Sequence, residues 1–465
     1  MDYVSTRGEA PVLGFSDALL QGLARDGGLY LPREWPRLSA EEMRALRGLP
    51  YAEAAFRLIR PFVGGEIADG PLRRIVEESY ATFRHAAVCP LVQTGPGEFV
   101  LELFHGPTLA FKDVAMQLLA RLMDHVLAER GARVTIAGAT SGDTGGAAID
   151  AFAGARRCDV FILFPHGRVS PVQQRQMTTS GAANVQAIAI EGNFDDCQAL
   201  VKAMFNDHAF RDRVGLSGVN SINWARIMAQ IVYYFTAAVS LGAPDRAVSF
   251  TVPTGNFGDI LAGYAAKRMG LPIGRLVIAT NENDILARAL SSGEYATRAV
   301  VATTSPSMDI QVSSNFERLL FEASGRDAAQ VRGYMESLRQ SGSFVIAAPT
   351  LLRIRSDFAA GRASMEETAA TIRETLARSG YLADPHTATA MKVAREKAVA
   401  GEIMVVLSTA HPAKFPQAVG EACGVTPSLP SWLDGLMEKD EVYTVLPTDL
   451  KMVEDHINRH TRAEG

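Results

Sequence analysis

The chain has 465 residues, of which 47% are hydrophobic and 21% are charged, and its formal net charge is -5. This length exceeds one simple core and predicts two or three packed units. The acidic balance and the lack of a basic run argue against nucleic acid as a partner, because neutralising phosphates needs a basic surface.

The first 95 residues mix short helical pieces with the stretch DGGLYLP and a proline-flanked segment near Cys89. They predict a small N-terminal domain, residues 1–95. The start of the chain is polar and no run reaches the roughly 18 to 20 apolar residues of a membrane helix, so a cytoplasmic protein is expected. Four widely spaced cysteines without a CxxC pair predict buried thiols and no metal site, Cys89, Cys158, Cys197 and Cys423.

Strand-like and helix-like segments alternate in the next part of the chain, which is predicted as a second domain, residues 96–215. Apolar residues at helical spacing predict a helix over 113–130. Apolar runs predict strands over 134–139, 159–164 and 185–190, with helices after the first and the third.

The same alternation continues in a third predicted domain, residues 216–465. A long buried helix is expected over 223–242, followed by strands over 248–253, 275–280 and 403–409, with helices after the first two of them. Residues 325–400 are predicted to be a mostly helical outer layer. The alternation indicates an α/β protein with parallel sheets and helices on both faces.

Two glycine-rich turns follow predicted strands, where doubly wound sheets bind ligands. The turn TSGDTGG, 140–146, matches neither a Walker loop nor G-x-G-x-x-G, but its backbone and the following helix start favour an anion. In PTGNFGD, 253–259, Gly255 and Gly258 allow backbone N–H groups to approach a phosphate. A purely structural turn stays open for both.

The segment LELFHGPTLAFKD, 101–113, contains Lys112, one of only eight lysines beside 38 arginines. A surface lysine with its stem on apolar neighbours is the alternative explanation. A buried lysine instead has a lowered pKa and forms Schiff bases with carbonyl groups. Together with a phosphate cradle, and with Ser408 or Thr409 as partner of a ring nitrogen, it predicts pyridoxal 5'-phosphate as the cofactor.

Six segments together resemble the longer bacterial and fungal threonine synthases: FHGPTLAFKD, ATSGDTG, INWARI, PTGNFGD, DPHTA and STAHPAKFP. STRG and DGGLYLP near the start also fit, so the resemblance covers nearly the whole chain. It implies the fold type II of pyridoxal-phosphate enzymes, similar to the tryptophan synthase β chain, with parallel or mixed sheets flanked by helices and a small N-terminal domain.

The resemblance also implies site residues. Lys112 would hold the cofactor and move the α-proton. The cofactor's phosphate would be wrapped by Gly255, Asn256, Phe257, Gly258 and Asp259, and Thr409, with Ser408 beside it, would meet the ring nitrogen. The substrate's carboxylate loop would consist of Ser141, Gly142, Asp143 and Thr144. The carboxylate of Asp143 conflicts with an anionic ligand, so it is expected to point away or to be hydrogen-bonded.

The reaction implied by the resemblance converts O-phospho-L-homoserine and water to L-threonine and phosphate. Arg226 is a candidate for the substrate's phosphate, although an ordinary helix arginine is as plausible. His105 and His386 lie in matching motifs, but neither is assigned a catalytic role. A serine/threonine dehydratase and an inactive module that binds phosphorylated ligands stay open, as do a monomer and a homodimer.

Overall fold

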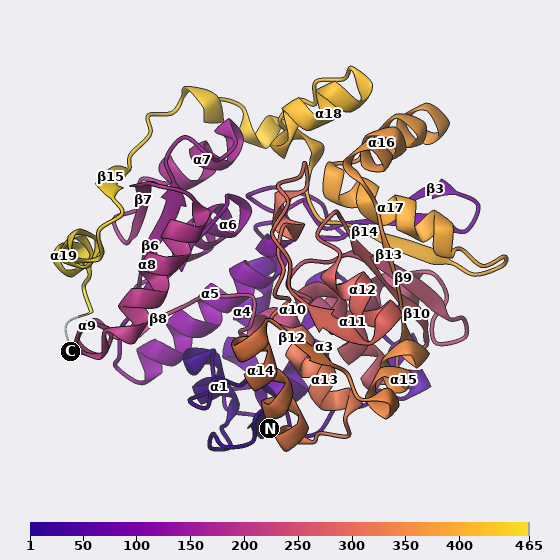
Figure 1. The fold of residues 1–465 in the computed structure, drawn as a ribbon, viewed down its shortest axis with the longest axis horizontal. Helices are drawn as coiled ribbons and strands as arrows, with labels where there is room; N and C mark the ends of the chain where they lie inside the picture. The colour runs from indigo at the N-terminus through magenta and orange to yellow at the C-terminus, as the bar shows by residue number, and fades with distance from the viewer. Residues whose placement is uncertain (464–465) are drawn as a thin grey trace.

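Two β-sheets lie next to each other in the computed structural model, which describes residues 1–463. The five-stranded sheet lies on the left of Figure 1 and the six-stranded sheet on the right, with helices packed on both. The predicted α/β class is therefore confirmed. No helix in the described residues is long and apolar enough to cross a membrane.

The six-stranded sheet has the order β13-β10-β9-β14-β4-β3, and only the pair β3 and β4 is antiparallel. Ser408 at the end of β14 pairs with Glu102 at the end of β4. The chain leaves both strands at the same edge, and from β4 it leads to Lys112. The bounds are β3 (Leu91–Gly95), β4 (Glu98–Glu102), β9 (Val248–Pro253), β10 (Ile273–Thr280), β13 (Phe358–Arg362) and β14 (Met404–Ser408).

The five-stranded sheet has the order β15-β7-β6-β5-β8 and is parallel throughout. Its central strand β6 is completely buried, which explains its unbroken apolar sequence. The bounds are β5 (Val134–Ala139), β6 (Cys158–Pro165), β7 (Val185–Glu191), β8 (Leu216–Ser217) and β15 (Thr444–Pro447). Two antiparallel pairs complete the strands, β1 (Tyr3–Ser5) with β2 (Tyr30–Pro32), and β11 (Glu294–Ala296) with β12 (Ser343–Val345).

Two central helices connect the parts of the molecule. Helix α10 (Trp224–Ser240) packs on α5 (Lys112–Glu129), on α3 (Tyr51–Val63) of the N-terminal segment and on α11 (Gly258–Arg268). Both α5 and α10 are buried over most of their length. A helix that is apolar on all sides is stable only in such an interior position.

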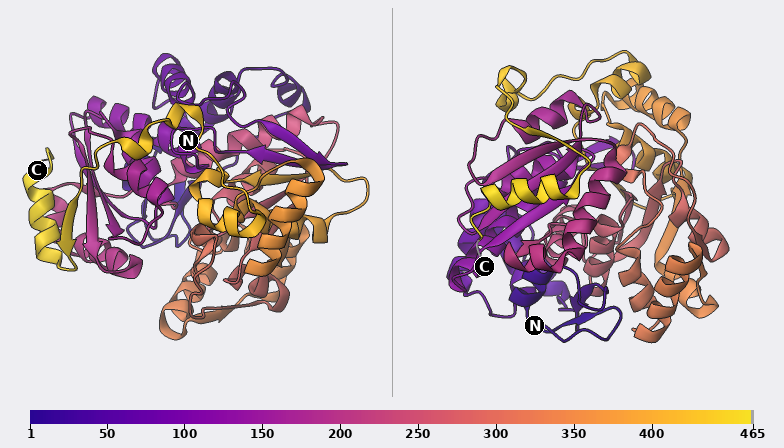
Figure 2. Two further views of the ribbon diagram at one scale, coloured as in Figure 1. Left: turned by 90° about the horizontal axis from the view of Figure 1, so that it is seen from above. Right: turned by 60° about the vertical axis from the view of Figure 1, so that its left-hand side comes forward.

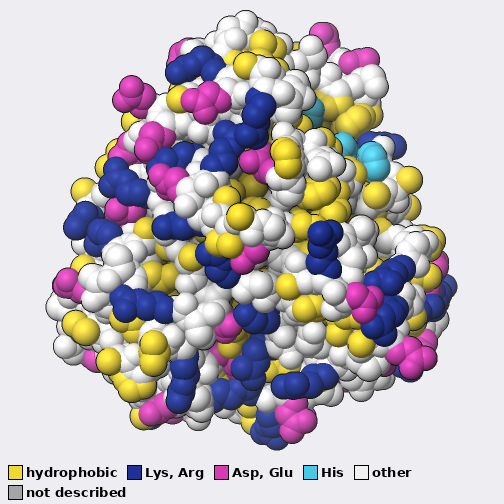
Figure 3. All heavy atoms as spheres, turned by 90° about the vertical axis from the view of Figure 1, so that its right-hand side faces the viewer, with side chains coloured by type: hydrophobic (Ala, Val, Ile, Leu, Met, Phe, Trp, Pro, Cys, Tyr) yellow, Lys and Arg dark blue, Asp and Glu magenta, His cyan; other side chains and the backbone are white. Residues whose placement is uncertain are grey.

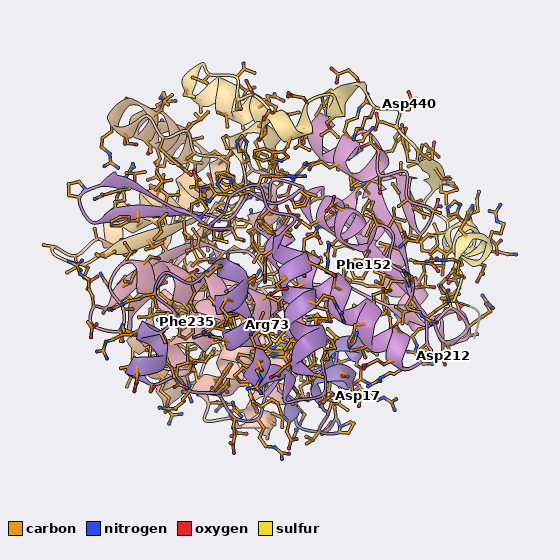
Figure 4. All side chains as sticks on the ribbon, turned by 180° about the vertical axis from the view of Figure 1, so that it is seen from behind. Asp17, Arg73, Phe152, Asp212, Phe235 and Asp440 are labelled. Atoms are coloured by element: carbon orange, nitrogen blue, oxygen red, sulfur yellow. The ribbon has the colours of Figure 1, made fainter. Side chains whose placement is uncertain are left out.

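The other helices form the outer layers. Seen from behind, the N-terminal helices that carry Asp17 and Arg73 lie in the lower half of the body, below Phe152 (Figure 4). The remaining bounds are α1 (Phe15–Gln21), α2 (Ala40–Arg44), α4 (Asp69–Tyr80), α6 (Asp143–Phe152), α7 (Pro171–Thr178), α8 (Phe194–Asn206), α9 (His208–Arg213), α12 (Ile285–Ser292), α13 (Phe316–Ala323), α14 (Ala328–Ser341), α15 (Ala348–Asp357), α16 (Met365–Ser379), α17 (Pro385–Lys397), α18 (Pro416–Cys423) and α19 (Leu450–His460), with 3-10 turns η1 (Pro306–Met308), η2 (Pro412–Lys414), η3 (Ser431–Leu433) and η4 (Leu436–Glu438).

Strands cross the predicted domain limits at residues 95 and 215. Strand β3, before the first limit, pairs with β4 after it, and β15 near the C-terminus joins the sheet of residues 96–215. The C-terminal segment passes over the top of the molecule to reach that sheet (Figures 1 and 2). Both sheets thus include strands from the two sides of a predicted limit, and the division into three domains stays a prediction.

Three sequence predictions need adjustment in detail. Residues 325–400 contain two strands, β12 and β13, because β13 finds its partner β10 about 80 residues earlier in the chain. Helix α5 begins at Lys112 itself. Three of the four free cysteines are buried as predicted, while Cys423 is only partly buried.

Charged side chains of both signs are mixed over the face in Figure 3.

Candidate active site

Lys112 is the first residue of α5, and only 8% of its surface is exposed. The end of β14 holds it in place, because the N–H of Phe111 donates to the carbonyl of Thr409 at 2.8 Å. The Nζ atom lies 3.4 Å from Oδ2 of Asp143 and 3.3 Å from Oγ of Ser307. The structure excludes the alternative of an exposed surface lysine.

The electrostatic surroundings keep the Lys112 amine easy to deprotonate. Burial lowers the pKa of Lys112, and although Asp143 opposes this, the nearby cations Lys414 and Arg226 lower it further. A lysine with a lowered pKa has the free amine that nucleophilic attack and proton abstraction both require.

Asp143 opens α6, and its carboxylate is buried between two lysines. Oδ1 accepts from Nζ of Lys414 at 2.9 Å and from Nε2 of Gln173 at 2.9 Å, while Oδ2 faces Lys112. Burial alone would raise the pKa of Asp143, but Lys414 and Lys112 outweigh burial and hold it well below its usual range. The expected hydrogen-bonded carboxylate is therefore present, and its charge is directed at cations.

The turn TSGDTGG joins β5 to α6 and is held by its own first residue. Oγ1 of Thr140 accepts from the N–H groups of Gly142 and Gly145, both at 2.9 Å. Gly142 has φ 140°, and a Cβ atom there would overlap the side chain of Gln173, so this position requires glycine. Within residues 1–463, no partner accepts from the N–H groups of Ser141, Asp143 and Thr144. These donors suit a carboxylate at the helix start.

The turn PTGNFGD joins β9 to α11 with Phe257 in the left-handed region, φ 65°. The backbone N–H groups of Gly255, Asn256, Phe257, Gly258 and Asp259 have no acceptor among the residues that the structure describes. Adjacent free donors at a helix N-terminus form a cradle for a phosphate. A Cβ atom at Gly255 would lie 2.6 Å from the carbonyl oxygen of Ser307, so this position too requires glycine.

The side chain of Asp259 does not contribute to this cradle. Its Oδ1 accepts from the hydroxyl groups of Tyr233 at 2.5 Å and Tyr234 at 3.1 Å, on α10. Only the main chain of Asp259 is thus available to a phosphate, and the carboxylate joins α11 to α10.

The two hydroxyl residues at the end of β14 have different surroundings. Oγ of Ser408 contacts Oγ1 of Thr387 at 2.9 Å and accepts from the hydroxyl of Tyr381 at 3.3 Å. Thr387 in turn donates to Asp384, so the Ser408 hydroxyl donates its only proton to Thr387. Thr409 is 6% exposed, and its hydroxyl forms no hydrogen bond within residues 1–463. Of the two residues, Thr409 is therefore the one whose hydroxyl is free to bond a ligand.

Arg226 lies in the first turn of α10 and is 4% exposed. One of its terminal nitrogens donates to the carbonyl of Val219 at 3.1 Å, while its Nε has no partner in the described part of the chain. Burial lowers the pKa of Arg226 to about 10. A buried guanidinium with an unused donor and an electrostatic effect on Lys112 suits an anion in this site.

Both histidines of the motifs have hydrogen bonds to the protein. His105 contacts Glu102 at 2.7 Å. Nδ1 of the buried His386 contacts Asp384 at 2.7 Å, and its Nε2 accepts from the N–H of Ser307 at 3.3 Å. These bonds fix the ring of His386 next to the loop that contacts Lys112, and they leave neither histidine an assigned chemical role.

Sequence reasoning missed three residues that contact the central carboxylate or lysine, namely Lys414, Ser307 and Gln173. Lys414 lies inside the segment STAHPAKFP, and its burial was the missing information. Ser307 comes from η1, and its Oγ is 3.3 Å from Lys112 and 3.4 Å from Asp143. Its neighbour Asp309 holds that loop by accepting from Asn281, at 2.7 Å. No pattern in the sequence around Ser307 indicated a contact with Lys112.

These groups together fit pyridoxal phosphate. A buried amine can bind its aldehyde, the free N–H groups of residues 255–259 its phosphate, and the Thr409 hydroxyl its ring nitrogen. A neutral hydroxyl at that nitrogen does not force it to be protonated. The turn 140–146 adds a second set of free N–H donors, suited to the carboxylate of an amino acid.

Three family models match the chain. Residues 2–80 match the model of the threonine synthase N terminus, residues 93–409 that of the pyridoxal-phosphate dependent enzymes, and residues 387–457 that of the threonine synthase C-terminal part. The second of these covers both glycine-rich turns, Lys112 and Thr409. The match to the threonine synthase N terminus, residues 2–80, lies outside the residues that match the general model of pyridoxal-phosphate dependent enzymes.

Relatives match over the full length. The threonine synthase of Pseudomonas aeruginosa is 55% identical, covering 99% of this chain and 98% of its own. The crystal structure of threonine synthase from Brucella melitensis with bound pyridoxal phosphate has a TM-score of 0.98 at 70% identity, with both chains fully covered. The yeast enzyme's structure has a TM-score of 0.94 at 40% identity, covering 99% of this chain and 98% of its own. The chain therefore belongs to the threonine synthase family of pyridoxal-phosphate-dependent enzymes.

Proposed function

We propose that this chain converts O-phospho-L-homoserine and water to L-threonine and phosphate. The observation that carries the proposal is the buried amine of Lys112 beside Asp143, at the junction of the phosphate-type cradle and the carboxylate-type turn. The family's reaction needs a proton carrier, a cofactor phosphate site and a substrate carboxylate site at one place, and these residues supply all three.

The cofactor, when bound, supplies an electron sink that stabilises negative charge at the carbon atoms that lose protons. Lys112 would hold it covalently, the N–H groups of residues 255–259 would bind its phosphate and Thr409 its ring nitrogen. Burial lowers the pKa of Lys112, and its free amine would also remove the α-proton of the substrate and return a proton at the end. The turn with Ser141, Asp143 and Thr144 orients the substrate through its carboxylate.

The substrate carries a second phosphate, which leaves from Cγ before water adds at Cβ. Arg226 supports this assignment, because its unused Nε donor is buried and its charge acts on Lys112. A guanidinium matches phosphate oxygens and stabilises a leaving phosphate. The role of Arg226 is part of the proposal, as are a location in the cytoplasm and a monomeric or homodimeric state.

The two alternatives have less support. A serine/threonine dehydratase does not need the N-terminal segment, yet residues 2–80 match the threonine synthase N terminus. An inactive binding module does not need a deprotonated lysine, yet Lys112 is buried with its pKa lowered.

The test measures phosphate and threonine released from O-phospho-L-homoserine by the purified protein with pyridoxal phosphate. Equal amounts of both products are expected, with little ammonia from serine or threonine. Ammonia as the main product would establish the dehydratase alternative. Binding of the cofactor without any turnover would establish the inactive module.

A further inference from the structure

Lys414 is a completely buried lysine whose three hydrogen-bond donors are all used. Its Nζ donates to the carbonyl of Thr108 at 2.6 Å, to Oε1 of Gln176 at 2.9 Å and to Oδ1 of Asp143 at 2.9 Å. An ammonium group has three N–H donors, so this arrangement satisfies it fully. The position of the Lys414 ammonium group is thereby fixed without any ligand.

Asp143 is engaged more closely with Lys414 than with Lys112. The contact to Lys414 is 2.9 Å, and Gln173 donates to the same oxygen at 2.9 Å. The contact to Lys112 is 3.4 Å, on the other oxygen, which Ser307 also shares at 3.4 Å. The carboxylate's charge is therefore balanced mainly by Lys414.

This balance matters because the proposed function uses Lys112 as a neutral amine. A lone buried carboxylate 3.4 Å away would stabilise the ammonium form of Lys112. Lys414, on η2, offsets that anion, and Arg226, on α10, adds a further cation. His386, on α17, also acts electrostatically on Asp143, and Ser307 is the uncharged neighbour of Lys112.

We propose that Lys414 is a positioning residue that takes Asp143 as its ion-pair partner and thereby leaves Lys112 as the neutral amine of the site. This inference rests on the proposed function, for which it names the residue that sets the charge state of the proton carrier. Lys414 acts through Asp143 and not on the substrate.

Lys414 also joins three segments: Thr108 before α5, Gln176 on α7 and Asp143 on α6. A purely structural role would destabilise the fold when Lys414 is replaced, but it would not move the titration of Lys112. The pH at which Lys112 reacts therefore separates the two roles.

The experiment uses the full-length protein after removal of bound cofactor. Pyridoxal phosphate is added between pH 6 and 10, and the rate of covalent capture on Lys112 is followed by borohydride trapping and peptide mass mapping. The compared variants are Lys414→Met, Lys414→Gln, Asp143→Asn/Lys414→Met and the control Lys392→Met. Lys392 also pairs with carboxylates, Glu367 and Glu396, but on the outer face of α17.

The midpoint of the capture profile should rise by about one to two pH units in Lys414→Met, because the unbalanced Asp143 then holds Lys112 as an ammonium ion. Capture at pH 7 should accordingly fall by roughly tenfold or more. The midpoint should return close to the wild-type value when Asp143 is replaced as well, and Lys392→Met should not move it. Lys414→Gln keeps hydrogen-bonding capacity and should show the same rise of the midpoint. This variant therefore tests the proposal even if Lys414→Met does not fold.

Folded Lys414 variants with a wild-type midpoint would overturn the proposal, and so would a double variant with the same rise as Lys414→Met. Thermal unfolding and circular dichroism establish that each variant is folded. Capture requires no turnover, so a wild-type protein that captures the cofactor on Lys112 but releases no phosphate contradicts the proposed function alone.

Discussion

Replacing Asp259 by asparagine should change how the stability of this protein depends on pH. Asp259 lies in the first turn of α11 and is 6% exposed. Its Oδ1 accepts from Tyr233 and Tyr234, while its Oδ2 has no partner in the described residues. Burial raises the pKa of Asp259 to about 7 against the lowering effect of the two tyrosine hydroxyls.

The size of the effect follows from this rise in pKa. The pKa of Asp259 rises from 3.8 to about 7, which is about three pKa units. This rise corresponds to roughly 4 kcal/mol at about 1.36 kcal/mol per unit. Because the pKa is raised in the folded state, the stabilising contribution is complete below pH 3.8 and is lost as the pH rises through 7. The ionisation of Asp259 therefore lowers the free energy of unfolding by roughly 4 kcal/mol between pH 4 and 8.

Asp259→Asn removes this loss, because an amide does not titrate and its oxygen can still accept from both tyrosines. The free energy of unfolding of the variant relative to wild type should rise by roughly 4 kcal/mol from pH 4 to pH 8. Asp113, whose buried carboxyl also has a pKa raised to about 7, is present in both proteins and cancels in the comparison.

The assay is urea unfolding at several pH values from 4 to 8, with the cofactor removed because its phosphate titrates in the same range. Asp212→Asn serves as the control, since this carboxylate is exposed on the molecule's edge (Figure 4). If the free energy of unfolding changed with pH in the same way in wild type and Asp259→Asn, the reasoning would be refuted. Asp259 would then ionise in the folded protein as easily as in the unfolded chain.

Other predictions concern the turns and the lysine. A Cβ atom at Gly258 would meet only ordinary contacts at 3.5 Å or more, so Gly258→Val should fold. The added side chain should nevertheless weaken the binding of pyridoxal phosphate at least about tenfold in equilibrium dialysis. Unchanged affinity would mean that the turn is only structural. Gly255→Ala should lower the free energy of unfolding, measured in urea, by about 1–3 kcal/mol, because the new Cβ atom crowds Ser307. A decrease of less than about 0.5 kcal/mol would contradict the expected crowding. Lys112→Ala should lose covalent cofactor in borohydride-treated peptides and should slow phosphate release by about 10²- to 10⁴-fold or more, whereas turnover near the wild-type rate would place the chemistry elsewhere.

Local sequence determined most elements and the identity of the central groups. Runs of apolar residues marked β5, β6, β9 and β14, because buried parallel strands need them. Glycine marked both turns, because the backbone at Gly142 and Gly255 leaves no room for a side chain. Short motifs, through their resemblance to a known family, were therefore sufficient to predict the cofactor, the reaction family and Lys112 as the cofactor's anchor.

Tertiary structure alone decided which groups surround Lys112. Ser307 and Lys414 reach the site from positions about 200 and 300 residues later in the chain, and no local pattern encodes such a contact. The same holds for the sheets, where β15 joins strands that lie about 250 residues earlier. Sequence periodicity reports which face of an element is buried, but the partner on that face depends on packing of the whole chain. For this reason the sequence presented Asp143 as a conflicting charge, and only the fold, by burying Lys414 against it, made that charge part of the site.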